Sequence, residues 1–332
     1  MRAWAVGQPG PAAGRPLQLV ERDLKEPGEG ELLARVRACG VCRTDLHLAE
    51  GDLPPRHPLV VPGHEVVAEV VSLGPGCRVF SPGDRIGVPW LASTCGSCRY
   101  CLSSRENLCE RPSFTGWDRD GGYAEQIVAR EEYLYPLPEN LSDEKAAPLL
   151  CAGIIGYRAL RRTELPAGGE LGIFGFGGSA HLAIQVALAE AASVHVFTRS
   201  AEARRLALSL GAKSAQTPFE PAPRPLDAAI VFAPAGEVVP AALARLAPGG
   251  RAVLAGIYMS DIPALAYDAH LFGERTLTSV TANTRTDGRN FLEIAGRIGV
   301  EVTTTPYPFE AAGDALSDLA AGRVRGAGVL LL

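Results

Sequence analysis

Leu171-Gly-Ile-Phe-Gly175-Phe-Gly177-Gly178-Ser-Ala180 is the stretch of this 332-residue chain that decides its fold. The apolar start is typical of a buried strand, and the alanine-rich run Ser179–Ala189 that follows is typical of a helix. One glycine permits a tight turn between them, and another lets the backbone approach a pyrophosphate at the helix N-terminus. This context predicts a dinucleotide site whose binding residues are Gly175, Gly177 and Gly178. The alternative is a turn that serves only packing.

Strands and helices continue to alternate on the C-terminal side of this turn. Further strands are predicted at Ser193–Thr198, Leu226–Ala233, Arg251–Gly256 and Thr276–Thr281, and helices at Ala201–Leu210 and Pro240–Leu246. Pro248-Gly249-Gly250 is expected to stop the second of these helices. Strands separated by helices imply a doubly wound parallel sheet, so we predict an α/β Rossmann domain over residues 142–285.

The end of the second strand in this domain bears on the identity of the cofactor. A site specific for NAD normally has Asp or Glu there, which accepts hydrogen bonds from the ribose hydroxyls. This chain has Thr198, Arg199 and Ser200 instead. A hydroxyl and a guanidinium suit a 2′-phosphate, so these residues favour NADP over NAD. The alternative is that Arg199 is a solvated surface charge, which leaves NAD open.

The residues on either side of the Rossmann domain have a different character. They are rich in Gly and Pro up to about residue 141, with short β-like runs at Glu31–Ala38, Val66–Leu73, Asp84–Val88 and Ala124–Val128. Residues 286–332 resume a mixed character and end in an apolar run. We therefore predict a second, mostly β domain formed by residues 1–141 and 286–332.

A lobe around residues 95–109 contains closely spaced cysteines. Cys95, Cys98, Cys101 and Cys109 have C-x2-C-x2-C-x7-C spacing, which can close a tetrahedral shell around one Zn²⁺. The N-terminal residues contain no apolar signal-like segment, so we expect a reducing, cytoplasmic location. Cysteine clusters in such a compartment bind metal more often than they form disulfides. The sequence therefore predicts a structural zinc site.

Three further segments resemble the catalytic zinc segments of the zinc-containing alcohol dehydrogenases, a family of the medium-chain dehydrogenase/reductase superfamily. They are Cys39-Gly-Val-Cys42-Arg-Thr44-Asp45-Leu-His47, Pro62-Gly63-His64-Glu65 and Leu150-Cys151-Ala-Gly. The four-cysteine lobe and the glycine turn also follow in the family's order, so the resemblance extends over essentially the whole chain. It implies that the mostly β domain is a GroES-like catalytic domain beside the Rossmann domain.

The resemblance implies a catalytic zinc in addition to the structural one. Its ligands would be Cys42, His64 and Cys151, which leave a fourth position open for substrate. Asp45 would fix the orientation of His64, and Glu65 would lie beside the metal and tune it. Cys39 and Cys77 are expected to be ordinary thiols.

Further roles follow from the same resemblance. Thr44 and His47 would relay a proton from the substrate hydroxyl through the cofactor ribose to solvent. Trp90 would line the substrate pocket. Relatives often have Thr four residues after the third ligand, where this chain has Ile155. We therefore expect the contacts to the nicotinamide to differ from those of such relatives.

The expected activity is that of a zinc-dependent alcohol dehydrogenase or aldehyde reductase, which transfers hydride between a zinc-bound alcohol or aldehyde and NAD(P). The alternative is a polyol dehydrogenase, or another zinc-dependent NAD(P) oxidoreductase on the same scaffold. Cys151 argues against the polyol enzymes, since such relatives often have a carboxylate there. A zinc-free quinone or enoyl reductase would need none of the three ligands.

Composition excludes other classes of protein. The net charge of −5 argues against a nucleic-acid-binding module built around the cysteine lobe, which would need a basic surface. No stretch of about 18 apolar residues is present, so no membrane contact is expected. The expected partners are a small-molecule alcohol or aldehyde and, from the resemblance, further copies of the chain in a homodimer or homotetramer.

Overall fold

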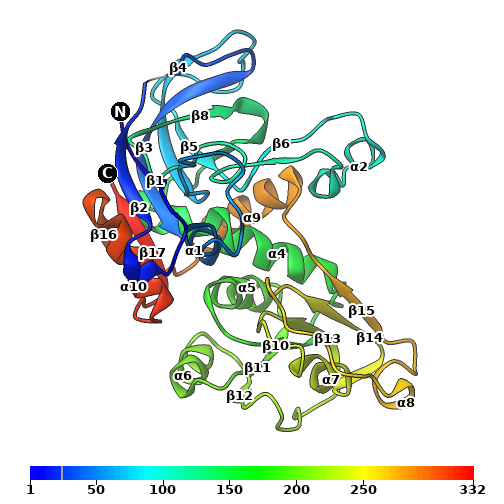
Figure 1. Cartoon of the computed structure of the whole chain (residues 1–332). Helices are drawn as coiled ribbons and strands as arrows, with labels where there is room; N and C mark the ends of the chain where they lie inside the picture. The colour runs from blue at the N-terminus through cyan, green and yellow to red at the C-terminus, as the bar shows by residue number, and fades with distance from the viewer. Residues whose placement is uncertain (24) are drawn as a thin grey trace. The chain divides into compact units, whose positions relative to one another are not determined.

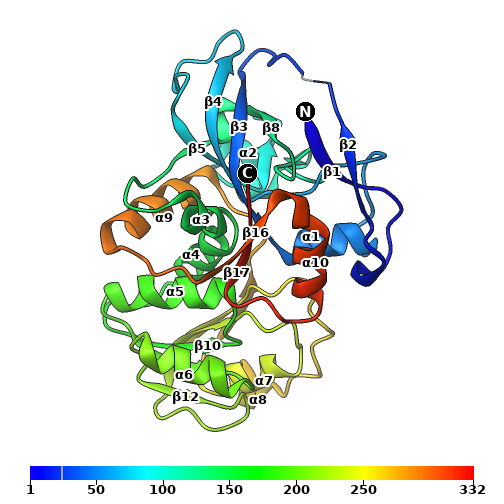
Figure 2. The same cartoon turned by 90° about the vertical axis from the view of Figure 1, so that its left-hand side faces the viewer.

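The computed structural model describes residues 1–23 and 25–332. The chain divides into two compact units, one formed by Met1–Cys151 with Ala282–Leu332 and the other by Ala152–Thr281. Figures 1 and 2 show the elements of each unit from two directions. Within the described residues, no helix is both long and apolar enough to cross a membrane.

The first unit is built on a sheet with strand order β16-β17-β3-β4-β5-β9, and β8 also pairs with β3. Its strands are β3 (Glu31–Val41), β4 (Val66–Leu73), β5 (Arg85–Val88), β8 (Gln126–Arg130), β9 (Tyr135–Pro136), β16 (Thr304–Pro308) and β17 (Ala327–Leu331). Strand β3 is central, and its buried residues include Leu32, Ala34 and Val36, as period-two alternation requires. Strand β17, near the C-terminus of the chain, pairs antiparallel with β3.

Smaller elements surround this sheet. The two-stranded sheets are β1 (Arg2–Val6) with β2 (Leu17–Glu21) and β6 (Leu91–Ser93) with β7 (Ser113–Phe114). The α-helices are α1 (Arg43–Glu50), α2 (Arg99–Leu102), α3 (Asp143–Ala146), α9 (Arg285–Ile298) and α10 (Ala312–Ala320). Short 3-10 helices are η1 (Ala12–Gly14), η2 (Glu106–Leu108), η3 (Glu131–Tyr133), η4 (Ala147–Leu150) and η5 (Phe309–Ala311).

The second unit contains a parallel sheet with strand order β12-β11-β10-β13-β14-β15. Its strands are β10 (Glu170–Phe174), β11 (Ser193–Phe197), β12 (Ser214–Gln216), β13 (Leu226–Val231), β14 (Leu246–Leu254) and β15 (Thr276–Ser279). Its helices are α4 (Ala152–Arg162), α5 (Gly178–Ala189), α6 (Ala201–Ser209), α7 (Val238–Leu243) and α8 (Tyr267–His270). The predicted fold class, a mostly β domain with a Rossmann domain, is confirmed.

The order of these strands reverses at β10, because β11 and β13 lie on its two sides. In open α/β sheets, ligands bind outside the carboxyl ends of the strands at such a switch point. Phe174 and Phe197, at the ends of β10 and β11, are fully buried and stack with ring centroids 4.4 Å apart. Their packing fixes the two strand ends that are followed by the turns predicted to bind the nucleotide.

The predicted boundary between α7 and β14 was wrong. The helix expected at Pro240–Leu246 lies at Val238–Leu243, and strand β14 already begins at Leu246. Leu246 pairs with Leu226 of β13, and the pairing shifts register before it resumes at Arg251. Gly249 adopts a φ of 76°. The Pro-Gly-Gly run therefore forms an irregularity inside strand β14 and is not the signal that ends α7.

Candidate metal and nucleotide sites

The sequence-predicted zinc ligands come together in the first unit. One ligand atom from each of Cys42, His64, Glu65 and Cys151 lies within 4.8 Å of the others. Cys42 follows β3 and caps α1, while His64 and Glu65 directly precede β4. The antiparallel pairing of β3 with β4 brings these two segments side by side, although about twenty residues separate them.

Asp45 connects the two segments at the centre of the cluster. Its Oδ2 accepts a hydrogen bond from the Cys42 amide at 2.9 Å, and its Oδ1 accepts one from the Gly63 amide at 3.0 Å. The same Oδ1 lies 3.1 Å from Nδ1 of His64. Asp45 is only 1% exposed, so these partners offset the cost of burying its carboxylate.

His64 provides the test of whether a metal fits this cluster. Its side chain is 1% exposed, and its Nε2 is buried with no hydrogen-bond partner among the described residues. A carboxylate on Nδ1 assigns the ring proton to that nitrogen and leaves the Nε2 lone pair free. An imidazole nitrogen, two thiols and a carboxyl group together form a set of ligand atoms that Zn²⁺ commonly binds in proteins. The residues present therefore fit the metal.

The protonation of the cluster reflects the contacts among its members. The pKa of the Cys42 thiol lies well below its usual range, chiefly because Cys151 hydrogen-bonds to it, and His64 acts in the same direction. That hydrogen bond and burial raise the pKa of Cys151 well above its usual range. Burial, followed by the charge of Cys42, raises the pKa of Glu65. A negative charge on one of these buried groups disfavours ionisation of the others. A bound cation would reduce this repulsion.

Gly40 of β3 makes room for Glu65. A Cβ built on Gly40 would lie 1.8 Å from Oε2 of Glu65 and 2.8 Å from its Cβ. The Gly40 amide also donates to the Glu65 carbonyl at 2.9 Å, so the backbones on both sides are fixed. Any larger residue at this position must push the carboxylate away from the metal ligands.

We predict that Gly40→Ala weakens zinc binding at this cluster by roughly 10- to 100-fold, the usual result of disturbing the groups around metal ligands. Chelator competition measured by zinc release would report the change. Gly313→Ala is the matched control, because a Cβ at Gly313 meets nothing within 4 Å. Equal zinc affinities for the two variants would contradict the role given to Gly40.

The two residues predicted to relay a proton lie on α1. The Cys42 sulfur lies 4.0 Å from Oγ1 of Thr44, at the first turn of this helix. His47 is near its end, and its Nδ1 lies 2.9 Å from Oδ2 of Asp52. The Thr44 hydroxyl thus lies beside the predicted metal ligand Cys42 at the start of the helix, and the His47 imidazole lies at its end beside the Asp52 carboxylate, which is 58% exposed.

Trp90 belongs to a group of aromatic rings beside His64. Its ring meets the His64 ring edge-on, with centroids 4.9 Å apart and planes at 72°. Phe114 stacks on Trp90 at 4.8 Å, and the ring of Trp117 lies nearly parallel to that of Trp90 at 6.1 Å. The Arg56 guanidinium lies over Trp117, 4.3 Å from the ring centroid. We call Trp90, Phe114 and Trp117 the aromatic wall.

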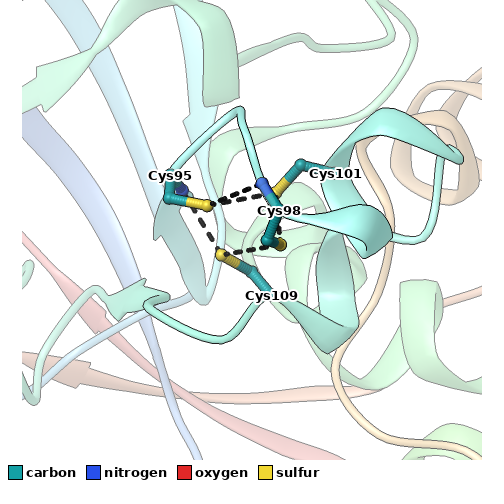
Figure 3. A group of neighbouring side chains, drawn as sticks. All are labelled: Cys95, Cys98, Cys101 and Cys109. Atoms are coloured by element: carbon teal, nitrogen blue, oxygen red, sulfur yellow. Dashed lines mark hydrogen bonds between the residues drawn. The ribbon is translucent and has the colours of Figure 1, made fainter.

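The four lobe cysteines converge as their spacing predicted (Figure 3). Sulfur–sulfur distances are 3.6 Å between Cys98 and Cys101, 3.9 Å between Cys95 and Cys101 and 4.0 Å between Cys98 and Cys109. A tetrahedron with Zn–S bonds of about 2.3 Å has edges of about 3.8 Å. The geometry fits a zinc ion, and all four sulfurs are free of disulfides.

Backbone amides point at the sulfurs of this lobe. Cys95 Sγ accepts from the Cys98 amide at 3.3 Å, and Cys109 Sγ accepts from the amides of Cys95 and Arg111, both at 3.3 Å. Backbone hydrogen bonds from Ser97 and Cys98 lower the pKa of Cys95 to about 5. Burial raises the pKa of Cys109 to about 11. The amides stabilise thiolate, the form in which cysteine binds metal.

The glycine turn of the second unit has the conformation expected for a phosphate site. Gly175 has a φ of 85°, and a Cβ there would lie 2.6 Å from the Ala233 amide nitrogen, so only glycine fits. Gly177 caps α5, and a Cβ on it would meet nothing within 4 Å. This open space over the helix N-terminus is where an anion can approach the backbone.

The three residues expected to read the ribose follow β11. Thr198 is 8% exposed, whereas Arg199 and Ser200 are exposed. Ser200 caps α6 by accepting a hydrogen bond from the Ala203 amide at 3.2 Å. The Arg204 guanidinium folds back onto the carbonyl oxygens of Thr198 and Arg199 at 2.8 and 2.9 Å. Because β10 and β11 are adjacent parallel strands, this segment and the glycine turn emerge at the same sheet edge.

Some residues at these sites were not found by sequence reasoning. Gly40, Asp52 and Trp117 were not assigned roles, and the contacts of Gly40 with Glu65 and of Trp117 with Trp90 depend on segments brought together by the fold. Asp52 alone follows a readable cue, since Gly51 ends α1 in the left-handed conformation with a φ of 94°. A helix-ending glycine returns the chain toward the last turn of the helix.

Comparisons with known proteins agree with this geometry. Residues 28–139 match the family model described as the alcohol dehydrogenase GroES-like domain. A Mycobacterium tuberculosis protein named "Probable alcohol dehydrogenase AdhA" is 54% identical over 337 residues, covering 100% of this chain and 97% of the relative. The chain is thus similar to this relative over its full length.

Solved structures give the same picture. A cinnamyl alcohol dehydrogenase from Sorghum bicolor is 28% identical with a TM-score of 0.89, covering 99% of this chain and 96% of that one. A cobalt- and zinc-bound thermostable alcohol dehydrogenase from Pyrobaculum aerophilum is 25% identical with a TM-score of 0.89, covering 100% and 99%.

Proposed function

Since this chain belongs to the zinc-containing alcohol dehydrogenase family of the medium-chain dehydrogenase/reductase superfamily, we propose that it interconverts an alcohol and an aldehyde using one catalytic zinc and NADP(H). The family makes it an oxidoreductase acting on CH–OH groups with a nicotinamide cofactor. The metal positions, the preference for NADP and the substrate class are the parts of this proposal that experiment must decide.

One observation carries the proposed metal site. The buried Nε2 of His64 has no hydrogen-bond partner among the described residues and belongs to a cluster with the sulfurs of Cys42 and Cys151. An unpaired polar atom in the interior costs about 1–3 kcal/mol. Asp45 holds the other ring nitrogen, so His64 cannot turn to satisfy Nε2 without losing that contact. A metal ion at this point relieves the cost.

The residues around the metal site would divide the work of the reaction. Zinc, when bound, acts as a Lewis acid that lowers the pKa of an alcohol hydroxyl and polarises a carbonyl. Asp45 keeps the His64 ring in the orientation and tautomer that a metal ligand needs. Thr44 would accept the proton of the substrate hydroxyl, and His47 would pass it on to solvent. Glu65 would adjust the charge beside the ligands.

The lobe of Cys95, Cys98, Cys101 and Cys109 would hold a second zinc of purely structural function. The close approach of the sulfurs supports a closed shell with no position left for substrate. The proposed stoichiometry is therefore two zinc ions per chain.

Arg199 supports NADP as the cofactor. It is exposed beside the N-terminus of α6, and no acidic side chain occupies Thr198 or Ser200. A guanidinium near a helix N-terminus suits a phosphate dianion, since both supply hydrogen-bond donors and positive charge.

We predict that Arg199→Ala raises the KM for NADPH by roughly tenfold, because a hydrogen bond to a charged group is worth about 1.5–3 kcal/mol. The KM for NADH should stay unchanged, since NADH has no 2′-phosphate. Steady-state kinetics with both cofactors would measure this, with the exposed Arg162→Ala as the matched control. A loss that is equal for both cofactors would argue that Arg199 does not read the phosphate.

The aromatic wall supports flat, apolar substrates. Trp90 contacts the proposed ligand His64, and Phe114 and Trp117 stack with Trp90 and with each other. Stacked rings favour a substrate with a π-system over a short aliphatic chain. We therefore expect aromatic aldehydes to give higher kcat/KM values than aliphatic aldehydes of similar size.

Exposed apolar side chains near the edge strand β15 support assembly with further copies of the chain. Ile257, Tyr258, Tyr267 and Phe272 are each more than half exposed, at 52%, 57%, 64% and 61%. Such a concentration is unusual on a monomer and is typical of a protein interface. We propose a homodimer or homotetramer, which sedimentation velocity would test; a monomer at micromolar concentration would refute it.

The activity itself is tested by following NADPH or NADH absorbance with aliphatic and aromatic aldehydes, with and without a zinc chelator. Turnover of NADPH that the chelator removes would support both the metal and the cofactor proposals. Turnover with NADH alone would support the dehydrogenase activity and refute the proposed preference for NADP. Turnover that survives complete removal of zinc would refute the catalytic metal.

A further inference from the structure

We propose that Asp52 is a positioning residue for proton transfer and acts through His47. This inference rests on the proposed function, since it assigns a task to the relay histidine. Its basis is the contact between Asp52 Oδ2 and His47 Nδ1, 2.9 Å apart. Neither the catalytic-segment motif nor the proposed metal ligands include Asp52.

The local backbone builds this contact into the end of α1. The amides of Gly51 and Leu53 both donate to the His47 carbonyl, each at 3.0 Å. Gly51 takes the left-handed conformation that lets the chain reverse there. The reversal brings the Asp52 carboxylate within 2.9 Å of His47 Nδ1. Because the turn is already hydrogen-bonded, holding the carboxylate in place requires little further ordering.

The carboxylate decides which ring nitrogen of His47 is basic. An ionised Asp accepts hydrogen bonds only, so a neutral His47 places its proton on Nδ1 toward Asp52. The lone pair then resides on Nε2, which is the nitrogen that can accept a proton. One proton enters at Nε2 for each alcohol oxidised and one leaves to water, so the ring and the carboxylate end each turnover unchanged.

Asp45 and His64 form another aspartate–histidine pair, and comparison with Asp52 and His47 clarifies the tasks of the two pairs. Asp45 and His64 lie 3.1 Å apart with side chains 2% and 1% exposed, as suits a histidine fixed on a metal. His47 is 17% exposed and Asp52 is 58% exposed. The same hydrogen bond at the surface orients an imidazole that can still exchange protons with water.

The first test compares Asp52→Asn in the wild-type and His47→Gln backgrounds. An Asn side chain can offer an N–H group to Nδ1, which favours the wrong tautomer. We expect kcat for alcohol oxidation to fall about tenfold or more in the wild-type background, as is usual when the partner of a functional histidine is lost. In the His47→Gln background the same change should have no effect. Equal losses in both backgrounds would overturn the inference.

The second test needs neither cofactor nor activity. The chain has six histidines, so long-range ¹H–¹⁵N spectra resolve few ring systems, and His47→Gln identifies the signal of His47. We expect the Nδ1–H tautomer in wild type and a shift toward Nε2–H in Asp52→Asn. An unchanged His47 tautomer in the variant would refute the positioning role.

A matched control removes the same charge elsewhere. Glu139→Gln changes an exposed carboxylate of the same unit and should leave both kcat and the His47 signal as in wild type. If wild type reduces no aldehyde and oxidises no alcohol, the proposed function is refuted. The ¹H–¹⁵N spectra then still test whether Asp52 sets the tautomer of His47. If wild type is active, His47→Gln is slow and Asp52→Asn equals wild type, only the present inference fails.

Discussion

Cys42→Ala is expected to lower kcat/KM for aldehyde reduction by about 10³-fold or more. A catalytic metal supplies several kcal/mol of stabilisation to the charge that develops in the transition state, and each 1.36 kcal/mol corresponds to about tenfold in rate. The substitution removes one of the two sulfurs from the cluster of Cys42, His64, Glu65 and Cys151, and we expect the remaining groups to bind zinc too weakly to retain it. Zinc content measured by mass spectrometry should fall from two ions per chain to one.

Cys39→Ala is the matched control for this prediction. Cys39 lies three residues earlier, on β3, and is fully buried, but its sulfur contacts the Gly40 carbonyl and is not part of the metal cluster. This variant should retain two zinc ions and most of the activity. A Cys42→Ala variant that keeps wild-type kcat/KM would refute the proposed catalytic site, whatever its zinc content.

Cys98→Ser is expected to destabilise the protein and to affect the chemistry much less. The lobe is tied to the rest of its unit through Glu106, which is 5% exposed and accepts hydrogen bonds from the Arg285 amide and Nε at 3.0 and 3.3 Å. Losing the metal should therefore loosen the start of α9 as well as the lobe. We expect the melting temperature to fall by roughly 3–4 °C, equivalent to about 2–3 kcal/mol for a chain of this size.

Cys77→Ser serves as the control for the lobe. Cys77 lies outside both clusters and donates to the Glu31 carbonyl at 3.1 Å, so its replacement should change neither zinc content nor melting temperature. Calorimetry on the zinc-loaded proteins would measure the difference. A Cys98→Ser variant that melts like wild type and retains two zinc ions would rule out the structural role of the lobe.

Local patterns in the sequence predicted most strands of the second unit. The run before Gly175 forms β10, and the alanine-rich segment after it forms α5, because both depend on neighbouring residues. One exception was the boundary near Pro248, where pairing of Leu246 with Leu226 overrode the helix-stop signal. Strand β12 was not predicted, since its three residues are too short for a periodic pattern.

Motif spacing predicted the four-cysteine site by itself but was not sufficient for the second cluster. The lobe cysteines lie within 15 residues of one another, so their spacing alone was enough to predict a shared metal. The second cluster depends on residues more than 100 positions apart, and only the family resemblance suggested that Cys42 and Cys151 act together. The structure brings these sulfurs together, and their role as ligands stays a prediction until zinc is measured.

The sequence by itself determined the fold class, the family and the kind of donors available, because these are written in short motifs and in hydrophobic periodicity. Only the tertiary structure decided which groups are buried and which face one another. It placed Asp45 against His64 and left Nε2 of that ring without a hydrogen-bond partner among the residues that the structure describes. It also placed the Glu65 carboxylate where a side chain at Gly40 would otherwise lie. These contacts join segments distant in the chain, and their energies depend on distance and desolvation, which no linear pattern records.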